Sequence, residues 1–265
     1  MNKIFVLLFT LFAVACDVNR SIVQEKAKPN IIFIMADDLG YHDLGCYGQK
    51  NISTPNIDKL AEEGLRFTQV YAGSTVCAPS RSTLMTGQHT GHTRVRGNFS
   101  KVKGLFEQDR VPILEEDTTI AEMLKSSGYV TGITGKWGLG EPGTSGIPNK
   151  QGFDEWFGYL NQRNAHSYYP PYLWHNEEKR TLEGNRDSSR QDYSHDLMVT
   201  FALDFIERHK DTTFFLYIPF TIPHDLYEVP DFSKFEEREW TKEEKIFAAM
   251  VERMDSDIGR IMGRL

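Results

Sequence analysis

The chain has 265 residues, of which 40% are hydrophobic, 12% aromatic and 25% charged. This composition is typical of a folded protein with a sizeable core, and it excludes an intrinsically disordered chain. The formal net charge of −7 argues against nucleic acid or an anionic membrane surface as the main partner. The length fits one large α/β domain or slightly more.

The first residues differ from the rest of the chain. Lys3 precedes an apolar run over residues 4–15 that is short for a membrane span and ends in small residues. Such a segment is typical of a signal peptide, so we expect residues 1–15 to be removed and the protein to be exported. Ala13-Val14-Ala15-Cys16 is similar to a bacterial lipobox, which predicts a periplasmic or outer-surface lipoprotein anchored through Cys16. Secretion without a lipid is the alternative.

A polar tether over residues 16–29 leads to the fold, which we expect to occupy residues 30–265. Residues 30–38 form an apolar run that ends in two carboxylates, which predicts a strand buried on both faces. Thr54-Pro55 predicts the start of a helix that ends before Gly64. Residues 66–71 then predict a strand.

An alternation of helices and strands continues along the chain. Capping-box residues Thr119 and Glu122 predict a helix over 120–127, followed by a strand over 129–133. Apolar residues at every fourth position of 197–205 predict an amphipathic helix, and 213–218 a buried strand. This alternation predicts an α/β fold with a mainly parallel central sheet.

Two further stretches bear on the domain boundaries. Residues 141–190, rich in Gly, Pro, Asn and aromatic residues, predict a long loop insertion near a binding site. A capping box at Thr241 and Glu244 begins a last helix, whose apolar stripe runs on to Leu265 with no strand after it. Alternating units need a returning strand, so we expect the sequence to be the N-terminal portion of a larger domain, truncated before its C-terminal part.

The segment Cys77-Ala78-Pro79-Ser80-Arg81, continued through Gly87, reads C-x-P-S-R-x-x-L-x-T-G. It resembles the signature of the type I sulfatases, the arylsulfatase-like enzymes of the alkaline phosphatase superfamily. In that family a maturation enzyme converts the cysteine to Cα-formylglycine, whose hydrate attacks the sulfur of a sulfate ester and whose second hydroxyl permits release. The resemblance implies an alkaline phosphatase-like sandwich and a sulfuric ester hydrolase. A helix start with a buried thiol is the alternative interpretation.

Asp37 and Asp38 follow the first predicted strand, at the edge where open parallel sheets bind ligands. Adjacent carboxylates repel each other unless a cation lies between them, and hard oxygen ligands suit Ca²⁺ or Mg²⁺; a solvated acidic turn is the alternative. The segment resembles the first metal-binding segment of the sulfatases, which implies Asp37, Asp38 and Cys77 as ligands of calcium. The family's later Asp-Asn pair has no match here, and we expect it beyond Leu265. Asp255 and Asp257 face apart on the last helix and are poor substitutes.

Three further residues match the family's catalytic positions. Arg81 lies four residues after Cys77, on the same helix face, and resembles the arginine that holds the formylglycine. Lys136, in Gly135-Lys136-Trp137, resembles the lysine that contacts the sulfate. His224, in Ile222-Pro223-His224, resembles the histidine near the leaving-group oxygen, where an imidazole can hold or give a proton.

One position departs from the family pattern. Many relatives read G-K-W-H-L-G, with a histidine hydrogen-bonded to the formylglycine, whereas this chain has Gly138. His166 is the best candidate for that place, and substrate binding is its alternative role. The aromatic stretch 159–174 predicts either stacking platforms for sugar rings or an aromatic satellite core.

The predicted substrate is a sulfated small molecule or carbohydrate. A phosphonate or phosphodiester hydrolase of the same superfamily is the enzymatic alternative, and a non-catalytic exported binding protein or inactive fragment is the alternative from another class. Of the three cysteines, Cys46 alone has no proposed role, so no disulfide framework is expected. A Cys46–Cys77 disulfide, which would remove the chemistry, is the remaining alternative.

Overall fold

The computed structural model describes residues 28–99 and 110–265, and within them a six-stranded sheet forms the centre of the fold. The strands lie in the order β1 (Ile31–Met35), β6 (Phe214–Pro219), β2 (Val130–Lys136), β3 (Glu155–Tyr159), β4 (Tyr172–His175) and β5 (Glu178–Thr181). The first four are parallel, and the last two pair antiparallel. The expected mainly parallel α/β sheet is confirmed.

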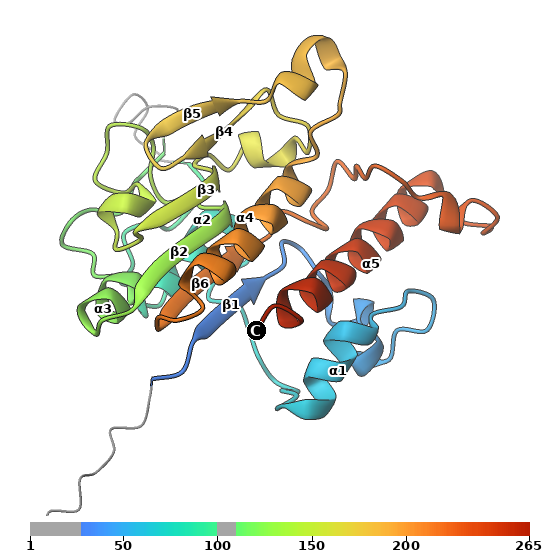
Figure 1. Ribbon diagram of the computed structural model, residues 1–265, viewed down its shortest axis with the longest axis horizontal. Helices are drawn as coiled ribbons and strands as arrows, with labels where there is room; N and C mark the ends of the chain where they lie inside the picture. The colour runs from blue at the N-terminus through green and yellow to red at the C-terminus, as the bar shows by residue number, and fades with distance from the viewer. Residues whose placement is uncertain (1–27, 100–109) are drawn as a thin grey trace, which may run out of the picture.

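Helices cover both faces of this sheet (Figure 1). Helices α2 (Cys77–Thr86) and α3 (Ile120–Ser126) pack on one face, and α4 (Ser194–His209) and α5 (Lys242–Met262) pack on the other. Helix α1 (Pro55–Glu63) packs against α5. The predicted capping boxes at Thr119 and Thr241 are both present and begin α3 and α5. The expected α/β sandwich is therefore the observed architecture.

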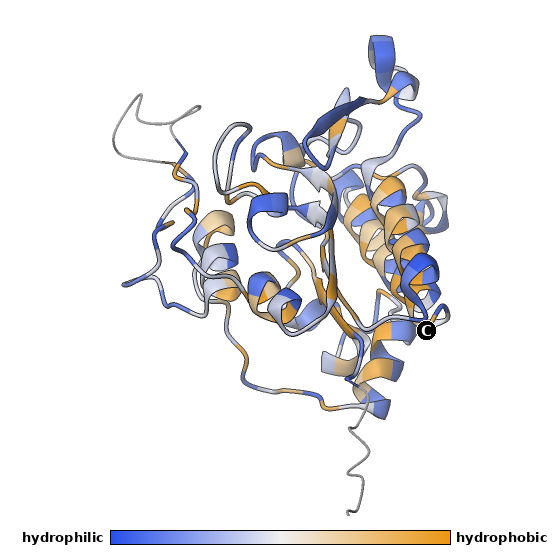
Figure 2. Ribbon diagram, turned by 60° about the vertical axis from the view of Figure 1, so that its left-hand side comes forward, coloured by the Kyte–Doolittle hydropathy of each residue, from blue (hydrophilic) through white to orange (hydrophobic). Residues whose placement is uncertain are grey.

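The central strand β6 divides the core into two layers. Phe215 and Tyr217 face a cluster shared with α2 and α3, whereas Phe214, Leu216 and Ile218 face a cluster shared with α4 and α5. Successive side chains of a strand point to opposite faces, so a strand buried on both sides must be apolar throughout. Figure 2 shows the hydrophobic strands between helices on either side.

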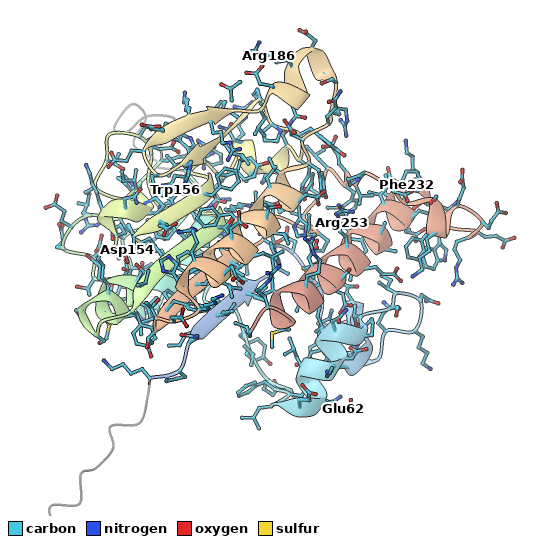
Figure 3. The ribbon with its side chains drawn as sticks, in the orientation of Figure 1. Glu62, Asp154, Trp156, Arg186, Phe232 and Arg253 are labelled. Carbon is cyan, nitrogen blue, oxygen red and sulfur yellow. The ribbon has the colours of Figure 1, made fainter. Side chains whose placement is uncertain are left out.

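Helix α5 is fixed to its neighbours by polar contacts as well as by its apolar stripe. Arg253 donates to both carboxylate oxygens of Asp196 on α4, at 2.6–2.9 Å (Figure 3). Asp255 accepts hydrogen bonds from the backbone N–H groups of Asn56 and Ile57, the first turn of α1, where a carboxylate stabilises the helix start. Asp255 thus has a structural role, as expected from its poor placement for a metal site.

Two sequence predictions about the elements are wrong. Residues 66–71 do not form a strand: Phe67, Val70 and Tyr71 are exposed, and no described strand pairs with them. Residues 141–190 are not one long loop, because they contain β3, β4 and β5, which extend the sheet. Local apolar pattern alone does not decide strand formation, since a strand needs a partner elsewhere in the chain.

The predicted signal peptide, the lipobox at Cys16 and most of the tether lie outside the described residues. Within the part of the chain that the structure describes, none of the helices combines the length and apolar character needed to cross a bilayer.

Candidate active site

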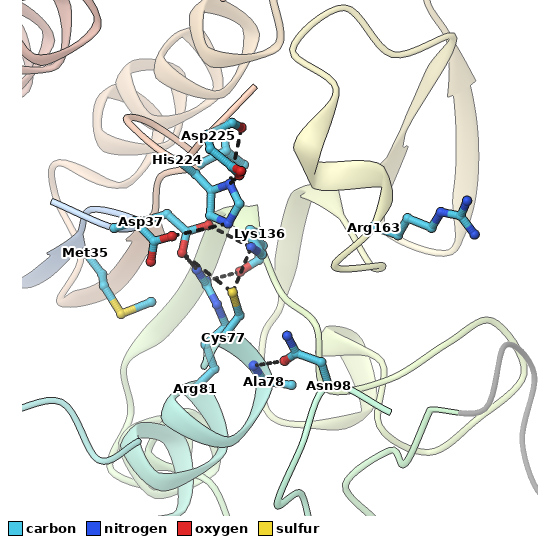
Figure 4. A network of polar contacts seen from close by, with 12 residues as sticks. Met35, Asp37, Cys77, Ala78, Arg81, Asn98, Lys136, Arg163, His224 and Asp225 are labelled. Carbon is cyan, nitrogen blue, oxygen red and sulfur yellow. Dashed lines mark hydrogen bonds and ion pairs between the residues drawn. The ribbon is translucent and has the colours of Figure 1, made fainter. Parts of the chain in front are cut away.

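The predicted site residues meet at the carboxyl edge of the sheet. Asp37 follows β1, Lys136 is the last residue of β2, and His224 lies in the loop after β6. Because these three strands are neighbours and run parallel, their carboxyl ends lie side by side. Cys77, the first residue of α2, completes the group, and Figure 4 shows the four side chains converging.

A buried ion-pair network surrounds the Asp37 carboxylate. Lys136 Nζ lies 2.7 Å from Asp37 Oδ2, and Arg81 Nη2 lies 3.4 Å from Asp37 Oδ1. The side chain of Lys136 is 0% exposed, which is rare for a lysine unless it is paired. Arg81 also donates to the backbone carbonyl of Lys136, so the two cations hold fixed positions around one carboxylate.

The Cys77 sulfur lies within this network. Its Sγ is 3.3 Å from Lys136 Nζ and 4.0 Å from Asp37 Oδ1. The position at the first turn of α2 also places the sulfur at the positive end of the helix macrodipole, which favours a thiolate. Cys77 and Cys46 are both free, so the alternative disulfide is not formed.

His224 also lies beside the sulfur. Its Nε2 lies 3.3 Å from Asp38 Oδ2, and its Nδ1 lies 2.7 Å from Asp225 Oδ1. The His166 ring stacks on the His224 ring, with centroids 4.2 Å apart. The structure thus brings together every predicted site residue, and it adds Asp225 as a contact of His224, which the sequence pattern did not indicate.

These side chains open into a cavity of about 690 Å³. Its wall includes Asp37, Asp38, Cys77, Arg81, His166 and His224. Lys136 lies behind the sulfur and is fully buried. Asn98 also lines the cavity, and its side-chain oxygen accepts a hydrogen bond from the Ala78 backbone N–H at 2.9 Å. A cavity of this size is large enough for a sugar-sized molecule.

The donor atoms suit part of a cation shell. One ligand atom each from Asp37, Cys77 and His224 lie within 4.8 Å of one another. Asp38 lines the same cavity and lies in the left-handed region at φ 62°, which aspartate adopts more readily than most residues. Two carboxylates are hard oxygen donors that fit Ca²⁺ or Mg²⁺, and a six- to eight-oxygen calcium shell needs further ligands besides these residues.

The neighbouring charges shift the pKa values of Asp37, His224 and Cys77. Burial raises the pKa of Asp37, but Arg81 and Lys136 outweigh it and hold that pKa below its usual value. The hydrogen bond to Cys77 raises the pKa of His224 to about 8, against the opposing effect of burial. Burial raises the pKa of the Cys77 thiol, whereas His224 and Lys136 lower it more. The site therefore stabilises negative charge at residue 77.

The reactivities of the two free cysteines test whether the site stabilises negative charge at residue 77. Burial and Asp58 raise the pKa of Cys46, opposite to the shift at Cys77. Only the thiolate alkylates, and one pKa unit changes its fraction about tenfold. In protein with unconverted Cys77 and a chelator at pH 7, we expect iodoacetamide to modify Cys77 faster than Cys46. Peptide mass spectrometry over time measures both rates, and equal rates would contradict the assigned charges.

The structure explains why residue 138 is glycine. Gly138 has φ +78°, and a Cβ atom there would lie 1.7 Å from Nε2 of Gln162. Gln162 is 3% exposed, and neither end of its amide has a hydrogen-bond partner among the described residues. The Gln162 side chain therefore occupies the space that a side chain at residue 138 would need, and nothing in the sequence pattern indicated this.

The aromatic stretch after β3 contains both buried and partly exposed residues. Tyr168 is 0% exposed, so it cannot stack on a sugar, whereas Tyr172 and Trp174 are partly exposed on β4. Lys179 lies over both rings, 4.8 and 5.4 Å from their centroids. Tyr168 thus supports the satellite-core alternative for its own position.

Comparison with known proteins agrees with this geometry. The N-acetylgalactosamine-6-sulfatase of Sus scrofa is 32% identical over 259 residues, which cover 89% of this chain and 47% of the relative. The crystal structure of Ps i-CgsB in complex with k-i-k-neocarrahexaose superposes with a TM-score of 0.77 at 30% identity, over 90% of this chain and 55% of that one.

A third structure, of BT4656 in complex with its substrate D-glucosamine-2-N,6-O-disulfate, superposes with a TM-score of 0.61 at 30% identity, over 76% of this chain and 36% of that one. The chain spans less than half the length of the curated relatives it matches. The family model described as Sulfatase matches residues 29–265. The chain belongs to the sulfatase family.

Proposed function

We propose that the protein hydrolyses sulfate esters, with sulfated carbohydrates as the substrate class, and that it acts after export from the cell. The observation that carries the proposal is the position of Cys77. Its sulfur lies 3.3 Å from the buried Lys136 ammonium, at the wall of a cavity that also contains Asp37 and His224. The same cysteine belongs to the C-x-P-S-R segment.

The residues of this chain are suited to bind and orient a sulfate group. Arg81 and Lys136 supply fixed positive charge beside residue 77, where the oxygens of a sulfate gain negative charge in the transition state. The His224 imidazole lies at the cavity wall near residue 77, where it can donate a proton to the oxygen of the departing alcohol. Preorganised cations in a buried site need no rearrangement during the reaction.

Two groups would complete the site. A formylglycine derived from Cys77 would supply the nucleophilic oxygen, and a divalent cation, calcium in the first instance, would add positive charge at the sulfate. Asp37, Asp38 and residue 77 would hold the cation. The closeness of ligand atoms of Asp37, Cys77 and His224, the position of Asp38 at the same cavity and the field that favours negative charge at residue 77 support this assignment.

The substrate class rests on the cavity and on the relatives. The similar Sus scrofa protein is named for a sulfated amino sugar, and the structure of BT4656 contains a sulfated glucosamine as its substrate. The cavity of about 690 Å³ admits at least one sugar ring. Conversion of Cys77 to formylglycine also implies a maturation enzyme as a partner. Lipidation of Cys16 would anchor the exported protein to a membrane.

Parallel assays on the complete gene product test the function. We expect release of sulfate from an aryl sulfate and from a sulfated sugar, and much slower hydrolysis of the phosphate and phosphonate esters of the same phenol. Preference for phosphorus would support the phosphonate or phosphodiester alternative. Mass spectrometry of the Cys77 peptide from the native host should show the lower mass of the aldehyde, whereas a fully alkylatable thiol would favour the non-catalytic alternative.

A further inference from the structure

Two residues of the segment after β3 contact His224. The His166 ring stacks on its imidazole, with ring planes 28° apart. Two residues later, the Tyr168 hydroxyl lies 2.8 Å from the backbone carbonyl oxygen of His224 and 3.1 Å from that of Thr221. One short segment therefore contacts both the side chain and the backbone of His224.

Tyr168 is itself held firmly in the core. Its ring belongs to the cluster formed with β6, α4 and α5, and its carbonyl accepts a hydrogen bond from the N–H of Ser194, the first residue of α4, at 2.9 Å. Burial raises the pKa of the Tyr168 hydroxyl, so the group keeps its proton. A buried hydroxyl that keeps its proton is a permanent donor.

The loop that carries His224 has little regular structure of its own. β6 ends at Pro219, and the His224 N–H makes only a long turn contact of 3.3 Å to the Thr221 carbonyl. Support must then come from outside the loop. The Asp37 N–H donates to the Ile222 carbonyl at 3.2 Å, and Tyr168 makes the shorter contact, directly to His224.

We propose that Tyr168 is a positioning residue for His224, and that His166 and Tyr168 together form a two-point clamp on it. The inference rests on the proposed function, in which His224 donates a proton to the departing oxygen. A displacement of about 1 Å at a catalytic group costs about a hundredfold in rate. Loss of the hydroxyl therefore slows turnover more than it weakens substrate binding.

Tyr168→Phe in the complete gene product tests the clamp, because it deletes only the hydroxyl. We expect kcat on a sulfated sugar to fall about tenfold to a hundredfold, with little change in KM. The fall should be larger for esters of poorly departing alcohols than for a nitrophenyl sulfate, since only the former need a proton from His224. A purely structural defect would lower both rates equally.

Tyr193→Phe is a matched control. Tyr193 is also buried in the same core cluster, and its hydroxyl also donates to a backbone carbonyl, that of Glu228, at 2.8 Å. The variant loses the same chemical group but no contact to His224, so its kcat should stay near the wild-type value. Equal losses in the two tyrosine variants would overturn the proposal.

Two further measurements test whether Tyr168 acts through His224. In a His224→Ala background, Tyr168→Phe should cause no additional loss, because the group that it positions is gone; a full additional loss would overturn the clamp. The imidazole NMR signals of His224 should shift in Tyr168→Phe and not in Tyr193→Phe. This readout needs no substrate, so it separates failure of the clamp from failure of the proposed function.

Discussion

Replacing Cys77 by alanine is expected to abolish sulfate ester hydrolysis and to leave the fold intact. The Cys77 sulfur lies among Lys136, Asp37 and His224 at the cavity wall, and alanine removes the atom from which the nucleophile derives. Loss of a nucleophile costs about 10⁴- to 10⁶-fold in kcat. The half-exposed side chain contributes little apolar burial, so Tm should change by no more than about 2–4 °C.

Steady-state assays of the complete gene product and thermal unfolding measure the two effects. Cys46→Ala is the matched control, because Cys46 is the other free cysteine of the described chain and lies before α1, away from the cavity. The control should keep full activity. Comparable rates for wild type and Cys77→Ala would show that residue 77 is not the nucleophile, whatever the thiol reactivity indicates.

The convergence of the site could be predicted because its residues follow buried strands. Asp37 and His224 follow largely apolar runs, whereas Lys136 ends a strand in which Thr and Gly residues separate Val130 from Ile133. Parallel strands bring such positions to one edge. The capping boxes at Thr119 and Thr241 could also be predicted from the sequence, because a cap depends on a few adjacent residues. Local signals thus placed the helix starts, whereas the roles of Lys136 and His224 were assigned through the resemblance to sulfatase motifs.

Contacts between distant segments could not be predicted in this way. The strands β3, β4 and β5 lie in a stretch whose turns and aromatic residues indicated a loop, and β5 is exposed along its whole length. Residues 66–71 have a strand-like composition but no described partner strand. In both cases the outcome depends on pairing across the sheet, which sequence pattern alone does not reveal.

The same limit applies inside the site. The place of Gln162 above Gly138 and the hydroxyl of Tyr168 behind His224 both arise from the path of the chain after β3. A glutamine and a tyrosine carry no motif, and each could equally lie at the surface or in a satellite core. Only the fold shows that the first explains the glycine and that the second supports the histidine.

Lys136→Met is expected to cause the second large effect, on stability as well as on activity. The substitution keeps much of the apolar volume but removes the ammonium that lies 2.7 Å from Asp37 Oδ2. Breaking a buried ion pair costs about 3–5 kcal/mol, and because Arg81 remains 3.4 Å from the same carboxylate, we expect about 2–3 kcal/mol here. Loss of fixed charge beside the sulfate should lower kcat at least about a hundredfold.

The pKa of Asp37 determines how the stability difference between the wild type and Lys136→Met depends on pH. Lys136 helps to hold the pKa of Asp37 below its model-peptide value of 3.8, so its stabilising effect is present above that pH and is lost as the pH falls through the depressed folded value. In the variant the pKa of Asp37 rises, and the carboxyl takes up its proton at a higher pH. The stability difference should therefore be largest near pH 7 and should narrow as the pH falls toward the depressed pKa of the wild-type Asp37 carboxyl, below 3.8.

Urea unfolding of the metal-free protein at several pH values measures this difference. Lys125→Met is the matched control, because Lys125 also forms a short pair, 2.6 Å from Asp154, but both side chains are substantially exposed. An exposed pair contributes about 0–1 kcal/mol, so the control should lose little stability and no activity. If the two methionine variants were equally stable at pH 7, Lys136 would not be the buried partner of Asp37. Arg81 would then be the only one of the two cations still proposed to bind the sulfate.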